Sequence, residues 1–165
     1  MTTEPFSPEW SPPGARRRKQ ILEATRSVAM VGASANPARP SYFVATYLLS
    51  SSADFEVYFV NPTGQEILGQ PVYASLADLP VVPDLVDVFR RAEDLPAVAE
   101  EAVAVGARTF WAQLGLTSIE AAQLARAAGL DVVMNRCLKI EHARFHGGLH
   151  LAGFDTGVLS ARRRR

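Results

Sequence analysis

The sequence predicts an α/β protein with a Rossmann-like, doubly wound parallel sheet of five strands in a single domain. From about Arg16 onward, short apolar segments alternate with segments of helical composition, which is typical of a parallel sheet covered by helices on both faces. The chain has 165 residues, 48% of them hydrophobic, enough to bury one core. Gly32 directly follows the first apolar segment, as in sheets that bind ligands where their strands end.

Cap and turn signals divide the chain into its elements. Residues 1–15 have no hydrophobic period and are rich in proline, so we expect an irregular leader there. Ser41 is placed to cap a helix whose earlier extension Pro40 blocks, and Thr117 or Ser118 is placed to cap another. The expected strands are residues 27–34, 55–62, 84–90, 108–115 and 131–137, and the expected helices are residues 16–26, 41–50, 94–107 and 117–130.

The remaining segments set the expected limits of the domain. Residues 63–80 are expected to form a turn-rich excursion with one short helical turn. The domain is then expected to cover residues 16–145, followed by a tail at 146–165. Residues 139–157 and the leader could pack on a second copy as a homodimer, or fold back on their own sheet.

Composition and charge exclude several classes of protein. Lys and Arg number 17, as do Asp and Glu, so the net charge gives no general attraction to nucleic acid. Basic runs at 16–19 and 162–165 are interpreted as solvated ends or as the polar face of a helix, with nucleic-acid binding as the alternative. No apolar run approaches the roughly 20 residues of a membrane span, and the first residues lack the apolar core of a secretory signal. We therefore expect a cytoplasmic protein without nucleic-acid or membrane partners.

The predicted topology brings four loops together. Right-handed crossovers place the carboxyl ends of all parallel strands at one edge of the sheet. The loops containing Gly32, Asn61, Arg90 and Gln113 follow four of the expected strands. Ligands of doubly wound sheets bind at this edge, so these loops are the candidate site.

The first of these loops, VGASANPARPSY at residues 31–42, has the features of an anion site. Gly32 allows a sharp turn, and the helix expected after it presents unpaired N–H groups and a partial positive charge. Ser34 and Ser41 can donate hydroxyl hydrogen bonds, and Arg39 can pair with a phosphate. The alternative is that Gly32 only makes a turn and the prolines only stiffen it.

The end of the second strand argues against a dinucleotide. NAD-binding folds normally have an Asp or Glu there for the ribose hydroxyls. Here the strand ends in Val60-Asn61-Pro62, which contains no carboxylate. Since the first loop also lacks the other glycines of a dinucleotide fingerprint, a ligand with a different sugar end is favoured.

Five segments in this order resemble the small stand-alone coenzyme A-binding proteins of bacteria, which are similar to the amino-terminal domain of the succinyl-CoA synthetase alpha subunit. They are VGASANPARPSYFVATYL, VYFVNPTGQEILGQPVYASLADLP, DLVDVFRR, GARTFWAQLG and GLDVVMNRCLKIEH, and they span roughly residues 16–145. The resemblance implies a Rossmann-like domain that holds coenzyme A. Its motif positions fall on Gly32, Ala33, Ser34, Arg39, Ser41, Asn61, Pro62, Phe89, Arg90 and Gln113.

The chemistry of coenzyme A suits these positions. Its pyrophosphate and ribose 3′-phosphate match helix-end N–H groups, serine hydroxyls and one or more of Arg39, Arg90 and Arg91. We expect Arg39 and Arg90 to meet phosphates, although both could be ordinary surface arginines. The adenine is expected near Val60 and Pro62 on one side and Leu79 or Pro80 on the other. Phe89 could instead belong to the core of the sheet, and for Trp111 a core position is favoured.

The sequence favours a binding module over an enzyme. The synthetases transfer a phosphoryl group through a histidine in a second domain, and this chain has no equivalent domain. No GxSxG elbow, P-loop or HExxH motif is present. A non-catalytic carrier, sensor or regulator of coenzyme A is therefore expected. An NAD(P)-dependent oxidoreductase or a partner-dependent acyl-CoA-processing enzyme is the alternative.

Two further groups of side chains are candidates for a chemical role, as metal ligands or as a reactive thiol. His142, His146 and His150 have helical spacing, but glycines interrupt the segment and no cysteine or aspartate completes a set, so no metal is expected. Cys137 follows the last expected strand and could meet the coenzyme A thiol as a mixed disulfide. A packed, buried thiol is the favoured interpretation.

Overall fold

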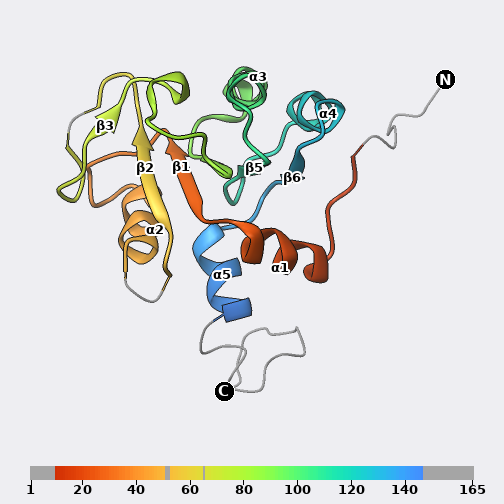
Figure 1. Cartoon of the computed structure of the whole chain (residues 1–165), viewed down its shortest axis with the longest axis horizontal. Helices are drawn as coiled ribbons and strands as arrows, with labels where there is room; N and C mark the ends of the chain where they lie inside the picture. The colour runs from red at the N-terminus through yellow and green to blue at the C-terminus, as the bar shows by residue number, and fades with distance from the viewer. Residues whose placement is uncertain (1–9, 51–52, 65, 147–165) are drawn as a thin grey trace.

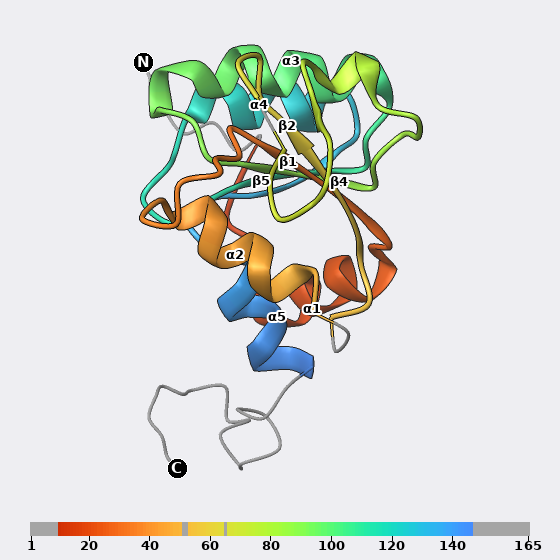
Figure 2. The same cartoon turned by 90° about the vertical axis from the view of Figure 1, so that its left-hand side faces the viewer.

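In the computed structural model the protein is a three-layer α/β sandwich (Figures 1 and 2). The structure describes residues 10–50, 53–64 and 66–146. One layer of helices lies on each face of the sheet, as the alternation of elements predicts. No helix in these residues is both long and apolar enough to cross a membrane.

The sheet has six parallel strands in the order β3-β2-β1-β4-β5-β6. The order reverses between β1 and β4, which is the switch point of a doubly wound sheet. Strand bounds are β1 Ser27–Val31, β2 Glu56–Val60, β3 Val72–Tyr73, β4 Leu85–Val88, β5 Thr109–Ala112 and β6 Asp131–Val133.

The expectation of five strands was wrong, because β3 was missed. Its two residues lie inside the segment expected to be a turn-rich excursion. Val72 and Tyr73 pair in parallel with Phe59 and Val60 of β2 at the edge of the sheet. A two-residue strand is too short to show an alternating pattern, so only the pairing reveals it.

Helices α3 and α4 cover one face of the sheet (Figure 2). Helix α3 spans Leu95–Val105 and α4 spans Ile119–Ala127, and buried alanines let the two pack closely together. Ser118 caps α4 as one of the two predicted residues, because its Oγ accepts a hydrogen bond from the N–H of Ala121 at 3.1 Å. Short 3₁₀ turns lie at Leu76–Asp78, as expected near that position, and at Ala92–Asp94.

Helices α1, α2 and α5 cover the other face (Figure 2). They span Ala15–Ala24, Pro40–Leu48 and Leu138–His146. The domain continues beyond β6, because α5 folds back and packs against α1 and α2. This answers part of the question left open for residues 139–157, while residues 147–157 lie outside the described part of the chain.

The start of α2 differs from the sequence prediction. The helix begins at Pro40 with Arg39 at the cap position, and Ser41 lies inside its first turn. Proline is favoured as the first residue of a helix because its missing N–H would have no partner there. Pro40 therefore starts the helix, and the Ser41 hydroxyl is available for a different contact.

Candidate functional site

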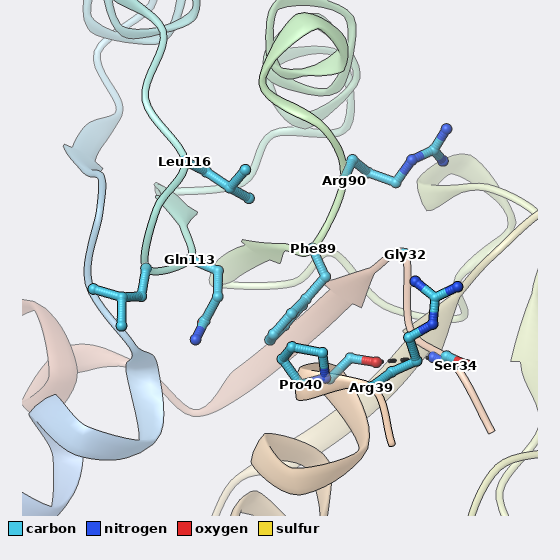
Figure 3. A pocket seen from close by; sticks show the side chains of 10 residues that line it. Gly32, Ser34, Arg39, Pro40, Phe89, Arg90, Gln113 and Leu116 are labelled. Atoms are coloured by element: carbon cyan, nitrogen blue, oxygen red, sulfur yellow. Dashed lines mark hydrogen bonds between the residues drawn. The ribbon is translucent and has the colours of Figure 1, made fainter. Parts of the chain in front are cut away.

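A pocket of about 340 Å³ opens at the switch point of the sheet (Figure 3). It lies among the loops after β1, β4 and β5 and the first turn of α2. This is the edge that the topology predicts for ligand binding. Its lining residues are Gly32, Ser34, Arg39, Pro40, Ser41, Phe89, Arg90, Gln113, Leu114 and Leu116.

Gly32 allows the loops after β1 and β4 to approach each other. Its φ of +88° is in the left-handed region, and a Cβ built on it would lie 2.7 Å from the carbonyl oxygen of Phe89 and 2.8 Å from Cδ of Arg90. The N–H of Gly32 donates to the carbonyl of Val60 at 2.9 Å, and that of Phe89 donates to Val31 at 2.8 Å. Only glycine fits this crossing of backbones.

Side chains of the first loop hold its own backbone in shape. The buried Ser41 Oγ accepts a hydrogen bond from the N–H of Ser34 at 3.0 Å, and Ser34 Oγ accepts one from Asn36 at 3.0 Å. Asn36 in turn accepts through Oδ1 from the N–H of Ala38 at 2.9 Å. The loop therefore enters α2 in a fixed conformation, with the amino-terminal end of that helix at the pocket.

The end of the pocket near Gly32 is cationic. The guanidinium groups of Arg39 and Arg90 lie on the Gly32 side of Phe89 (Figure 3). Arg39 is exposed and has no ion pair within residues 10–50, 53–64 and 66–146, whereas Arg90 lies 3.6 Å from the carboxylate of Asp94. Two arginines beside a helix amino terminus make this end suited to phosphate groups.

The opposite end of the pocket is mainly apolar. Phe89 and Leu116 line it together with the amide of Gln113 (Figure 3). Leu114 is a further apolar residue of the pocket lining. Gln113 extends β5, since its N–H donates to Val88 of β4 at 3.2 Å. Its side chain is buried, and Oε1 has no hydrogen-bond partner in the described part of the chain.

A second hollow of about 140 Å³ adjoins the first at Ser34. Ala33, Asn61, Thr63, Gly64 and Ile67 also line it. Asn61 joins its two walls, because Nδ2 donates to the carbonyl of Ala33 at 2.8 Å and Oδ1 accepts from the N–H of Thr63 at 3.0 Å. The loops after β1 and β2 are thus held together by one side chain.

The structure places most of the predicted site residues in these two hollows, with two exceptions. Val60 is buried in the core beneath α3, and Leu79 packs on the same cluster, so neither lines the two hollows. The adenine position expected near them stays a prediction. Pro62 is exposed and lines neither hollow. Arg91 is also outside them and lies 3.4 Å from Glu93 and 3.6 Å from Asp94.

Pro40, Leu114 and Leu116 were not predicted as site residues. Pro40 was interpreted only as a helix boundary. The sequence did offer one signal for the two leucines as site residues. They closely follow Gln113 in a loop at the end of a strand, and loops of this kind often carry binding residues. Trp111 is fully buried, as the favoured interpretation held, and its Nε1 donates to the carbonyl of Arg136 at 2.8 Å.

The remaining candidates for chemistry belong to the packing of α5. His142 is buried, with Nδ1 2.7 Å from the hydroxyl of Tyr47 and its ring against Phe55. Within the described residues no three metal-ligating side chains gather, and His150 lies outside them. Cys137 is buried in the cluster beneath α2 and α5, in agreement with the favoured interpretation of that thiol.

Comparison with known proteins identifies the family. The sequence model of a CoA-binding domain family matches residues 26–143. The chain belongs to this family. The match contains every strand, both hollows and the whole of the candidate site.

The chain aligns with nearly the full length of two relatives from this CoA-binding family. The uncharacterized protein YneT of Bacillus subtilis is 40% identical over 131 residues, which are 79% of this chain and 96% of that protein. A solved hypothetical protein of Pyrococcus horikoshii is 34% identical with a TM-score of 0.77, covering 88% of this chain and all of that one.

A larger protein contains the same fold. The dinucleotide-forming acetyl-coenzyme A synthetase 1 of Ca. Korarchaeum cryptofilum is 22% identical with a TM-score of 0.60. The alignment covers 66% of this chain and 26% of that one. At this identity the likeness shows the fold alone, so the contacts of the site are argued from the chain itself.

Proposed function

We propose that this protein binds coenzyme A or an acyl-CoA at the switch-point pocket, as a non-catalytic carrier, sensor or regulatory module. The observation that supports this is the division of the pocket into a cationic end and an apolar end. Coenzyme A has the same division between its phosphates and its arm. The family of the chain supports the same ligand.

The phosphate end has suitable donors. Pro40 has no N–H, and the N–H groups of Arg39 and Tyr42 donate to the carbonyls of Asn36 and Arg39. The N–H of Ser41, together with Arg39 and Arg90, would hold the pyrophosphate. Because Gly32 has no side chain, the loop after β4 that carries Arg90 can lie directly against the loop after β1 at this end of the pocket.

The second hollow is the better candidate for the adenosine. It adjoins the pocket at Ser34, and small residues such as Ala33 and Gly64 form its walls. Among the described residues no acidic side chain lines it, whereas an NAD site normally needs one for the ribose hydroxyls. This observation favours coenzyme A over the NAD(P) alternative.

The pocket lining favours binding over catalysis. It consists of hydroxyl, guanidinium, amide and apolar groups. At neutral pH these groups orient a ligand more readily than they exchange protons with it. The cytoplasmic location and the homodimer remain predictions.

Thermal unfolding with coenzyme A, acetyl-CoA, NAD, NADP and ATP tests the proposal. Coenzyme A or acetyl-CoA should raise the melting temperature, because a ligand that binds only the native state stabilises it. Stabilisation by NAD alone would reject coenzyme A as the ligand. Turnover of an acyl-CoA by the purified protein would reject the non-catalytic role.

A further inference from the structure

The unpartnered amide oxygen of Gln113 points to a specific part of the ligand. About 92% of this residue is buried, and it lines the pocket at the end away from the arginines. Oε1 has no partner in the described part of the chain. A buried amide oxygen without a hydrogen bond is unfavourable, because it has given up its bonds to water and gained none in return. Native proteins retain such groups mainly where a ligand or water satisfies them.

The side-chain amide can serve a donor and an acceptor together. It carries two N–H donors and one carbonyl oxygen, and rotation about its last bond exchanges their positions. A secondary amide presents the complementary pair, one N–H and one C=O. A phosphate offers no donor at neutral pH, so it cannot satisfy Oε1.

The surroundings of Gln113 fit an aliphatic arm. Phe89 and Leu116 lie on the same side of the pocket as its amide, and Leu114 adds a further apolar side chain to the lining. An arm of methylene and methyl groups would bury its apolar surface there, and Gln113 would be the polar group that fixes its position. The site therefore matches an aliphatic chain interrupted by amides.

The distance from the phosphate end agrees with this arm. Gly32 follows β1 and Gln113 follows β5, with β4 between them. Neighbouring strands lie about 4.8 Å apart, so the two loops are separated by about 10 Å. In the arm of coenzyme A, the two amide nitrogens follow the phosphorus by roughly six and ten bonds, or about 7 and 12 Å at about 1.2 Å per bond. Both amides therefore fall near Gln113.

We propose that Gln113 is a specificity-determining residue that hydrogen-bonds a secondary amide in the ligand's aliphatic arm. This inference rests on the proposed binding of coenzyme A. It adds that the chain distinguishes coenzyme A from other phosphorylated adenosines through Gln113 and not through the arginines.

The decisive comparison uses adenosine 3′,5′-bisphosphate, which resembles the nucleotide end of coenzyme A and has no arm. Calorimetric titration of Gln113→Leu should show an affinity for coenzyme A that is about 5- to 50-fold lower, the loss of one or two hydrogen bonds. Its affinity for the bisphosphate should stay within about twofold of the wild-type value. Gln123→Leu, a matched change on α4 away from both hollows, should alter neither.

A second measurement keeps the test independent of the variant's folding. In wild-type protein labelled with ¹⁵N, the side-chain NH₂ signals of Gln113 should shift on addition of coenzyme A and stay unchanged with the bisphosphate. Equal losses for both ligands in Gln113→Leu, or no loss for coenzyme A, would overturn the role of Gln113. A wild-type protein that binds neither ligand would instead overturn the proposed function together with it.

Discussion

Gly32 and Phe89 approach so closely that a Cβ on Gly32 would lie 2.7 Å from the carbonyl oxygen of Phe89. At this point the loops after the two central strands, β1 and β4, cross, and both residues line the pocket. The position of the pocket therefore depends on the absence of one side chain.

Gly32→Ala should destabilise the protein and impair the pocket. The new methyl group meets backbone, which cannot move aside as a flexible side chain can. Gly129→Ala is the matched control, because its φ of +92° is similar and no described atom lies within 4 Å of the Cβ position. Urea unfolding should show a loss of about 1 kcal/mol for the control from the backbone conformation alone. The loss should be clearly greater for Gly32→Ala, and equal losses would contradict the steric argument.

Arg39→Ala should weaken binding of coenzyme A by about tenfold or more, as expected for a charged hydrogen bond to phosphate. Arg39 lines the pocket without an ion-pair partner in the described part of the chain. Arg91→Ala is the control, since Arg91 lies outside the pocket beside Glu93 and Asp94. Calorimetric titration at two salt concentrations provides the measurement. An unchanged affinity would remove Arg39 from the site and leave the helix backbone as the main phosphate ligand.

Asn61→Asp should weaken the side-chain contact that holds the loops after β1 and β2 together. The substitution removes the Nδ2 donor and sets a carboxylate oxygen against the carbonyl of Ala33, now 2.8 Å from that nitrogen. We expect a loss of about 1–3 kcal/mol in the free energy of unfolding. The same change in charge at Asn36→Asp should have little effect, because the Asn36 side chain only accepts a hydrogen bond, from the N–H of Ala38 through Oδ1, which a carboxylate can also accept. Similar losses in both variants would indicate a general effect of charge.

Asp87 should make stability fall as pH rises. Its carboxyl is fully buried on β4 without a partner in the described residues, and this burial raises its pKa well above the usual value. Between the unfolded-state pKa, about 4, and the higher native pKa, the folded chain holds a proton that the unfolded chain releases. The stabilisation from the protonated Asp87 carboxyl is therefore complete below about pH 4, and it is lost as the pH rises through the native pKa.

The pH effect of Asp87 can be isolated by comparison with Asp87→Asn. Unfolding free energies of the two proteins should be measured from about pH 4 to pH 8. The difference, wild type minus variant, should decrease with pH by at most about 1.4 kcal/mol per unit. The other carboxyl groups cancel in this difference, so a flat curve would show that Asp87 does not titrate as its burial requires.

The sequence was informative wherever a pattern is local. Apolar runs located the five longer strands, and Ser118 signalled the start of α4. A two-residue strand such as β3 depends on a partner distant in sequence, so no local pattern predicts it. Ser41 was misassigned as a cap because the preference of Pro40 for the first helical position prevailed.

The candidate site was predictable to the level of loops but not of side chains. Parallel topology alone brings Gly32, Arg90 and Gln113 to one edge. It does not show that Val60 faces the core or that Oε1 of Gln113 has no partner. Those properties depend on which face of the sheet each side chain points to, and on the tertiary contacts around it.

The ion pair between Arg18 and Glu141 has a consequence for how the protein is made. Nε of Arg18 in α1 lies 2.7 Å from the carboxylate of Glu141 in α5, and both side chains are buried. During translation α1 emerges long before α5, so the carboxylate that pairs with Arg18 is absent until α5 has left the ribosome. Because α1 packs on α5 and its Arg18 is paired there, a nascent chain that ends at β6 should leave α1 incompletely packed on the domain. Release of α5 would then act as the signal that completes the domain.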